Sequence, residues 1–403
     1  MESHKLEMNV FEAWQWQDPP PEIEHGGPEG LRSLTFVLSY TTCLSLSTGI
    51  HPIMFIATTV SASFSPVGIV KTPNFRTPPV VGVWAEVFPP FMPKETEKIK
   101  DPFARRLASR IERLPVELSI SNACIMSSCV KPKIKNTANP LVLLHGFDSS
   151  CLEWRYTQPL LEKAGFETWA IDILGWGFSN LENLPLCNVE SKRDHLYQFW
   201  KSYIGRPMLL VGPSLGAAVA IDFAVNHPEA VDKLILMDAS VYAEGTGSLS
   251  RLPRFVAYAG ASVLKSLPLR LYATSLTFNS LPFNTCLDWT RIGRLHCLLP
   301  WWEEATVDFM NSGGYNVISQ INQVRNKTLI IWGEDDQIID SKLAVQLHCE
   351  IPNATIRQIP KCGHLPHIEK PDDVANLIKD FIEARNVPVV LKKEEKVLVR
   401  QFE

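Results

Sequence analysis

Short apolar runs alternate with amphipathic segments over the last two-thirds of the chain. Runs of strand length cover residues 140–145, 168–173, 207–211, 231–237, 327–332 and 354–359. Helical patterns lie between or after them, through Leu160 and Leu161, over 217–225 and over 372–384. Apolar strands that alternate with helices form a mostly parallel sheet covered on both faces. The pattern therefore predicts an α/β fold.

Two further segments precede the first of these strands. Residues 94–112 are rich in Lys, Arg and Glu, which predicts a short amphipathic helix. Residues 114–130 predict two short strands, because polar Ser121 and Asn122 separate two apolar stretches. We assign residues 94–239 to the first part of the core and 326–387 to the second part, followed by a charged tail at 388–403.

One stretch interrupts the alternation. Residues 239–324 contain no clear strand, are rich in Leu, Phe, Tyr and Trp, and include four prolines. The stretch is too long for a structureless loop in a compact domain, so we predict a helical lid at 240–325. Its apolar side chains either line a substrate pocket or pack the lid onto the sheet, and both interpretations stay open. The set is Phe255, Tyr258, Leu264, Leu267, Leu269, Leu271, Tyr272, Leu276, Phe278, Trp301 and Trp302.

The first 93 residues differ in composition from the rest. Residues 1–30 are polar and contain Pro and Gly clusters, which predicts disorder. Residues 31–85 contain no Asp or Glu and many Ser and Thr, as organellar transit peptides do. A membrane span over 33–70 is the competing interpretation, but Pro52, Pro66 and the hydroxyl side chains disfavour it. We expect an extension at 1–93 with a transit-peptide-like segment.

Charge and cysteine content narrow the function classes. The formal net charge is −4, whereas nucleic-acid binding usually requires a basic excess, so we predict no nucleic-acid partner. The nine cysteines form no CxxC pair and are odd in number. In a chain of this size we expect mostly reduced thiols.

The strongest chemical signal is Gly212-Pro213-Ser214-Leu215-Gly216. It joins an apolar strand to a helix of small residues, the context in which G-x-S-x-G forms a nucleophile elbow. The glycines avoid collisions at a tight turn, and the turn holds the Ser214 hydroxyl clear of the sheet. Ser214 is the predicted nucleophile.

A serine hydroxyl requires a base, and the base requires an acid. His364 lies in the loop after the last predicted strand and is the predicted base, with His367 as its rival. The loop after the strand at 327–332 contains several carboxylates, of which Asp336 is the first choice and Asp335 the alternative. Asp238, which follows the strand at 231–237, is a third candidate.

Two backbone N–H groups are expected to stabilise an oxyanion. Leu215 follows the nucleophile, and Phe147 belongs to His145-Gly146-Phe147 at the end of an earlier strand. We predict that their N–H groups form the oxyanion hole, and that His145 braces the loop.

From about residue 140 to 385 the chain resembles the α/β-hydrolase superfamily. Five motifs in order carry the resemblance: His145-Gly146-Phe147, Asp172-x-x-Gly175-x-Gly177-x-Ser179, Gly212-x-Ser214-x-Gly216, Trp332-Gly-Glu-Asp-Asp336 and Gly363-His364-x-Pro-His-x-Glu-Lys-Pro371. The resemblance implies the α/β-hydrolase fold, with Asp336 as the acid and His364 as the base. More narrowly, the chain is similar to plant plastid members near pheophytinase, chlorophyll dephytylase-like enzymes and a hydrolase linked to vitamin E synthesis.

These observations lead to a functional hypothesis. We expect a serine hydrolase that cleaves a hydrophobic carboxyl ester, such as a lipid or phytyl ester, in the chloroplast stroma or envelope. It would need no cofactor and no metal, and its partner would be the small ester substrate, with peripheral association with a plastid membrane left open. The alternatives are a ligand-binding receptor with little turnover, and a thioester or carbon–carbon bond hydrolase.

Overall fold

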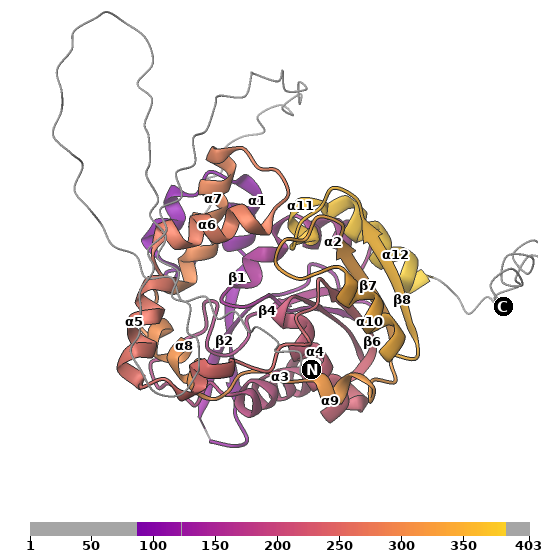
Figure 1. Cartoon of the computed structure of the whole chain (residues 1–403), viewed down its shortest axis with the longest axis horizontal. Coiled ribbons are helices and arrows are strands. Elements are labelled where there is room, and N and C mark those ends of the chain that lie inside the picture. The colour runs from indigo at the N-terminus through magenta and orange to yellow at the C-terminus, as the bar shows by residue number, and fades with distance from the viewer. Residues whose placement is uncertain (1–86, 122, 384–403) are drawn as a thin grey trace, which may run out of the picture. The chain divides into compact units, whose positions relative to one another are not determined.

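The computed structural model describes residues 87–121 and 123–383, and their centre is a sheet of eight strands (Figure 1). The strands are β1 (Ile111–Glu117), β2 (Cys124–Val130), β3 (Leu141–Leu143), β4 (Thr168–Ile171), β5 (Met208–Pro213), β6 (Val231–Met237), β7 (Lys327–Gly333) and β8 (Ala354–Ile359). Strands β3 to β8 pair in parallel, and the β1–β2 hairpin joins them through an antiparallel contact of β2 with β4. The order β1-β2-β4-β3-β5-β6-β7-β8 confirms the predicted, mostly parallel sheet.

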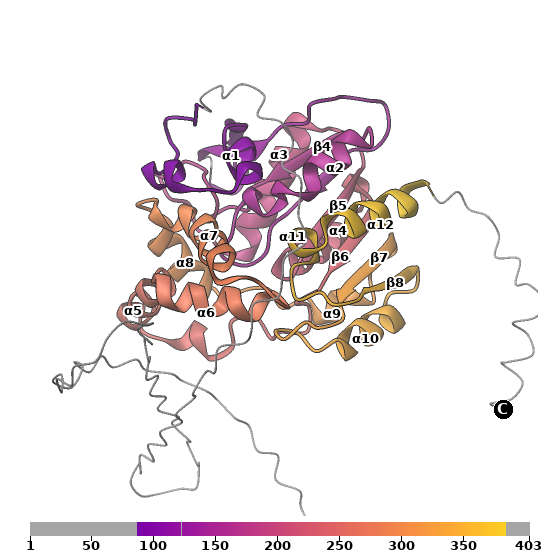
Figure 2. The same ribbon diagram turned by 90° about the horizontal axis from the view of Figure 1, so that it is seen from above.

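Helices cover both faces of the sheet (Figure 2). One face packs against α3 (Val189–Tyr203), α4 (Leu215–Asn226) and α10 (Lys342–Glu350), and the other against α1 (Pro102–Ala108), α2 (Thr157–Lys163) and α12 (Pro371–Glu383). Neighbouring residues of one strand point to opposite faces of the sheet. In β5, Leu210 packs on the face covered by α3, α4 and α10, and Leu209 packs on the face covered by α1, α2 and α12. This alternation explains why the central strands are apolar at nearly every position.

The segment between β6 and β7 is helical. It contains α5 (Arg254–Leu264), α6 (Leu267–Thr277), α7 (Phe283–Arg294), the 3-10 helix η5 (Leu295–Leu298), α8 (Trp302–Asn311) and the short α9 (Ile318–Ile321). Figures 1 and 2 both place α5 to α8 together at one side of the sheet, away from β8. We call residues 240–311 the lid. Helix α9 instead packs on α4 through the core residue Ile321.

The predicted helix over 94–112 is wrong in extent. The chain forms a 3-10 helix, η1 (Lys94–Lys98), then α1, and residues 111 and 112 already belong to β1. Pro102 prevents one continuous helix, because the residue before a proline is disfavoured in the helical region. Asp101 is extended and caps α1 by accepting hydrogen bonds from the Phe103 and Ala104 N–H groups at 2.8 and 3.3 Å.

Several predictions concern other parts of the chain. Residues 1–86, for which we predict disorder and a transit-peptide-like segment, and residues 388–403, for which we predict a charged tail, lie outside the described residues. Within the described ranges, no helix combines the length and apolar character that crossing a bilayer requires. The eight cysteines that the structure describes are all free thiols.

Candidate active site

The predicted site residues meet at the carboxyl edge of the parallel sheet. Ser214 directly follows β5, Asp238 follows β6, Asp336 lies just after β7 and His364 just after β8. These four strands are consecutive neighbours in the sheet. Because parallel strands end on the same edge, four distant parts of the sequence present polar side chains to one region.

The turn at Ser214 is strained in the way a nucleophile elbow requires. Ser214 has φ 49° and ψ −120°, a conformation that few non-glycine residues adopt. A Cβ on Gly212 would lie 2.1 Å from the Gly216 carbonyl oxygen, and one on Gly216 would lie 2.6 Å from that of His145. The Ser214 N–H donates to the Met237 carbonyl at 2.8 Å, which fixes the turn against β6. Only glycine at these two flanking positions permits the close crossing of strand, turn and helix.

His364 and Asp336 form the pair that the sequence predicted. His364 Nδ1 lies 2.8 Å from Asp336 Oδ2, and both side chains are almost completely buried. An ionised carboxylate only accepts, so Nδ1 carries the proton and Nε2 is left as the basic nitrogen. The Asp336 carboxylate also accepts from the Ile338 and Ile339 N–H groups at 2.8 and 3.1 Å.

The environment keeps Asp336 ionised. Burial alone would raise the pKa of Asp336, but the hydrogen bond and charge of His364, with the two backbone N–H groups, lower this pKa below its usual value.

Gly363 lets the His364 loop approach the lid, because a Cβ there would lie 2.4 Å from the Thr277 carbonyl oxygen. The His364 N–H donates to this same oxygen at 2.7 Å.

The other two carboxylate candidates occupy different environments. Asp335 is exposed and accepts from the Asn279 side chain at 2.5 Å. Asp238 is fully buried, accepts from the Gly333 N–H at 2.8 Å, and its Oδ2 has no hydrogen-bond partner among the described residues. Burial, and then the charge of Asp336, raise the pKa of Asp238 well above its usual value. This shift favours the protonated form of Asp238, whereas the lowered pKa of Asp336 favours its ionised form.

The rival base His367 lies elsewhere. It is fully buried against the Trp154 ring, with ring centroids 4.5 Å apart, and its Nε2 lies 3.4 Å from Glu153. Burial lowers the pKa of His367, and Glu153 opposes that shift. His367 is therefore a buried residue that packs against Trp154 and lies beside Glu153.

The loop after β3 approaches the nucleophile. A Cβ built on Gly146 would lie 3.7 Å from Ser214 Cβ, and the Gly146 N–H donates to Glu153 at 3.0 Å. His145 is fully buried, and its Nε2 accepts from the Ile173 N–H at 3.0 Å, so its Nδ1 donates to the Gly146 carbonyl at 2.8 Å. Among the described residues, no acceptor is recorded for the N–H of Phe147 or of Leu215. Two unengaged donors therefore lie near Ser214, one on the loop after β3 and the other at the first residue of α4.

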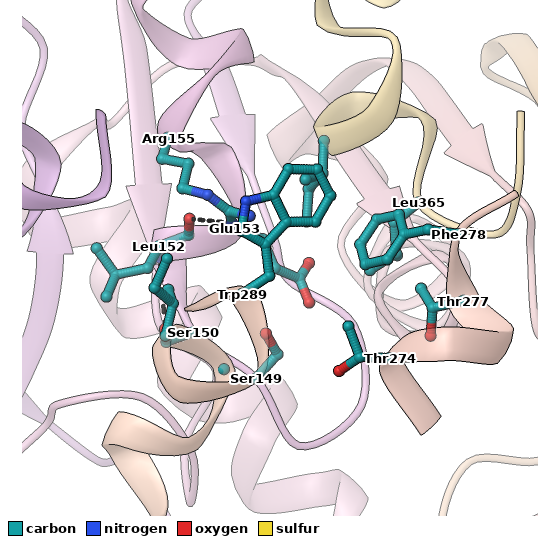
Figure 3. Close-up of a pocket in the computed structure, with 13 residues that line it drawn as sticks. Ser149, Ser150, Leu152, Glu153, Arg155, Thr274, Thr277, Phe278, Trp289 and Leu365 are labelled. Atoms are coloured by element: carbon teal, nitrogen blue, oxygen red, sulfur yellow. Dashed lines mark hydrogen bonds between the residues drawn. The ribbon is translucent and has the colours of Figure 1, made fainter. Parts of the chain in front are cut away.

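A cavity lies beside the His364 loop, between η2 (Cys151–Arg155) and lid helices α6 and α7. It has a volume of about 100 Å³ and mixes hydroxyl, charged and aromatic side chains. Figure 3 shows Trp289 and Phe278 facing this space together with Glu153, Thr274 and Thr277. Leu365, the residue after the base, also lines it.

Two groups of three side chains bring potential metal ligands within 4.8 Å of one another. The first comprises Asp238, Asp336 and His364, which are the acids and base described above. The second comprises Asp148, His296 and Cys297, where the carboxylate already accepts from the Arg270 and Trp302 side chains. Each group takes part in hydrogen bonds within the protein.

Sequence reasoning missed Glu153 and Asp148. Glu153 supports the Gly146 amide, and Asp148 connects the loop after β3 to the lid. Asp148 directly follows the motif His145-Gly146-Phe147, and this position could have marked it as a candidate residue. Its partners lie more than 120 residues away in the chain, however, and only the fold reveals them.

Comparisons with known proteins agree with this geometry. Residues 139–371 match the family model for the alpha/beta hydrolase fold. The chain is 59% identical over 297 residues to the alpha/beta hydrolase domain-containing protein VTE7 of Arabidopsis thaliana, a match that covers 73% of this chain and 90% of that protein. It is 28% identical over 255 residues to the 2-hydroxy-6-oxo-2,4-heptadienoate hydrolase of Pseudomonas putida, covering 62% of this chain and 90% of that protein.

A solved structure shows the same fold at lower sequence similarity. A thermophilic esterase from Thermogutta terrifontis aligns with a TM-score of 0.58 and 19% identity, covering 67% of this chain and 98% of the esterase. The predicted family resemblance is thus confirmed by the family model, by a relative at 59% identity and by the sheet itself. The chain belongs to the alpha/beta hydrolase fold family.

Proposed function

We propose that the protein is a serine hydrolase that cleaves carboxyl esters through an acyl-enzyme. Family membership supports hydrolase activity, and the arrangement around Ser214 supports the serine mechanism. The observation that carries the proposal is the strained turn at Ser214 on the same sheet edge as the His364–Asp336 hydrogen bond.

The reaction follows from the roles of these groups. Ser214 Oγ attacks the ester carbonyl while His364 Nε2 takes its proton, and Asp336 stabilises the resulting imidazolium. The Phe147 and Leu215 N–H groups donate to the developing oxyanion. His364 then gives the proton to the departing alcohol, and water hydrolyses the acyl-enzyme by the same steps in reverse order.

The substrate that we propose is a hydrophobic ester, such as a phytyl ester of a chlorophyll-type pigment or another lipid ester. Its cleavage would supply phytol for tocopherol synthesis. The lid supports this proposal, because its residues Phe278 and Trp289 line the cavity beside the His364 loop with aromatic rings. The cavity of about 100 Å³ is smaller than the roughly 300–1,000 Å³ typical of ligand sites, so a long chain requires the lid to move.

Labelling with a fluorophosphonate tests the serine mechanism. The full-length protein should become covalently labelled, and Ser214→Ala should abolish the label. The control variant Ser250→Ala, which removes a partly exposed lid hydroxyl, should label like the wild type. Equal labelling of the wild type and Ser214→Ala would refute an activated Ser214. A profile of esters should then show faster turnover of phytyl or long-chain esters than of acetates, and the reverse order would refute the substrate class.

A second reaction remains a candidate because of a relative's name. The molecule 2-hydroxy-6-oxo-2,4-heptadienoate contains a ketone and no ester, so its hydrolysis breaks a carbon–carbon bond. The same triad can serve that chemistry. Turnover of such a keto acid without turnover of any ester or thioester would favour this candidate. Saturable binding of a lipid ester without turnover would instead favour a receptor.

We also propose a plastid location, on the basis of the acid-free, hydroxyl-rich residues 31–85. The plastid stroma or envelope is the expected location. A fluorescent fusion to the C-terminus of the full chain should colocalise with plastids, and deletion of residues 1–86 should abolish this localisation. Unchanged localisation after the deletion would contradict the proposal.

A further inference from the structure

Asp148 is the residue that follows the predicted oxyanion donor Phe147. Its backbone has φ 49°, the left-handed region that Asp tolerates better than most residues but that still costs free energy. Its side chain is buried, with 6% of the residue exposed. A buried carboxylate on a strained loop persists only when surrounding groups stabilise both the charge and the backbone.

Among the described residues, three side-chain N–H groups donate hydrogen bonds to the Asp148 carboxylate, and all three belong to the lid. Arg270 of α6 forms an ion pair with Oδ2, while His296 Nε2 of η5 lies 3.0 Å and Trp302 Nε1 of α8 lies 2.8 Å from Oδ1. Burial alone would raise the pKa of Asp148, but the Arg270 charge and the hydrogen bonds lower it below its usual value. The carboxylate therefore joins three lid elements at one point of the core.

Phe147 makes a second connection to the same lid. Its ring packs on Phe309 of α8 at a centroid distance of 6.3 Å and on Trp176 of the core at 5.3 Å. On the other side of Phe147, Gly146 is held by the core through Glu153. The Phe147 amide thus lies between a residue fixed by the core and a residue fixed by the lid.

We propose that Asp148 is a positioning residue through which the lid sets the direction of the Phe147 N–H. When the lid is seated, three donors fix the Asp148 carboxylate and the Phe147 amide completes the oxyanion hole. When the lid moves to admit a long substrate, the loop loses these contacts and the donor loses its alignment. The catalytic consequence rests on the proposed serine mechanism, whereas the coupling of loop to lid is a property of the structure alone.

Asp148→Asn tests the proposal, because asparagine has the same size but no charge for Arg270. The matched control is Asp308→Asn, which weakens another contact between α8 and the core, the hydrogen bond from the Cys187 N–H at 2.6 Å, without touching the loop. Loss of one oxyanion donor lowers kcat by about 10²- to 10³-fold in other hydrolases. Since misalignment is a partial loss, we expect Asp148→Asn to lower kcat about 10- to 100-fold with little change in KM, and the control to leave kcat unchanged.

Hydrogen exchange of the peptide spanning residues 146–150 gives a readout that does not depend on turnover. Exchange should be faster in Asp148→Asn than in both the wild type and Asp308→Asn. If Asp148→Asn fails to fold, Trp302→Phe removes one donor while keeping most of the ring packing, and it should produce the same two effects at smaller size. Equal loop exchange in an Asp148-directed variant and the control would overturn the proposal. An inactive wild type would refute the proposed function, and loop exchange alone would then decide this inference.

Discussion

At the scale of single residues, two neighbouring carboxyl groups have pKa values that are shifted in opposite directions. Asp336 is surrounded by donors, namely His364 and two backbone N–H groups, whereas Asp238 has one donor and a charged neighbour. Burial raises the pKa of both, but the donors around Asp336 lower its pKa below the usual value, while the charge of Asp336 raises that of Asp238 further. The place of Asp238 after a strand left it open as a third candidate, whereas in the structure Asp336 and not Asp238 lies in hydrogen-bond contact with His364 Nδ1.

Asparagine substitutions should separate the two acids. Asp336→Asn should lower kcat/KM by about 10³- to 10⁴-fold, because it removes the acid that fixes the His364 tautomer. Asp238→Asn should retain most activity, since asparagine has the size and charge of the protonated acid that the raised pKa favours. Asp335→Asn is the exposed control and should behave like the wild type. Steady-state kinetics on one activated ester checks all three, and a loss in Asp238→Asn as large as that in Asp336→Asn would contradict the assignment.

The same pKa shifts predict opposite dependences of stability on pH. The pKa of Asp238 is raised in the folded state, so folding favours its proton, and its contribution to stability falls as pH rises above about 3.8. The pKa of Asp336 is lowered, so its contribution is present at neutral pH and disappears as pH falls through the folded-state pKa. Urea unfolding at pH 5 and pH 8 should therefore show Asp238→Asn gaining stability relative to the wild type at the higher pH. A constant difference between the two proteins would contradict the raised pKa.

At the scale of elements, predictability follows from how completely an element is buried. The central strands were predicted because both faces of the sheet are covered, which makes them continuously apolar. Helices α3 and α10 were not predicted: α3 is largely polar, although Asn188 caps it by accepting from the Ser191 N–H at 2.9 Å. The site residues were predictable because each stands next to a strand end or in a glycine turn. The Asp148 contacts were not, because their donors lie in lid helices whose packing no local pattern encodes.

Helix α7 contacts the segment before α1 through the buried carboxylate of Asp288. Asp288 accepts from the Lys100 and Asp101 N–H groups at 3.3 and 3.0 Å. Asp288→Ala should leave these two N–H groups without partners and reduce the free energy of unfolding by about 1–3 kcal/mol. Glu304→Ala removes an exposed pair with Arg254 at 3.8 Å and should leave the free energy of unfolding nearly unchanged, because solvent screens such a pair. Urea unfolding checks both, and equal losses would show that α7 is held by other contacts.

At the scale of the whole molecule, the hydrolase core begins before its first regular helix. Met92 is buried in the core cluster of the α1, α2 and α12 face, and Phe88 and Phe91 pack against it. The Arg113 guanidinium of β1 lies 4.1 Å from the centroid of the Phe91 ring, and that of Arg105 lies 4.8 Å from the Phe88 ring. The boundary that we predicted at residue 94 therefore leaves Phe88, Phe91 and Met92 out of the core, although they pack against it.

Two truncated chains should reveal this difference. A chain that begins at residue 87 retains Phe88, Phe91 and Met92, and one that begins at residue 94 lacks all three. Since burying one large apolar side chain contributes about 1.5–3 kcal/mol, the shorter chain should unfold several degrees lower. Phe88→Ala in the longer chain, which removes one partly buried ring, should have an intermediate effect. Equal melting temperatures for the two truncated chains would mean that residues 87–93 rest on the core without stabilising it, and that the core is complete from residue 94.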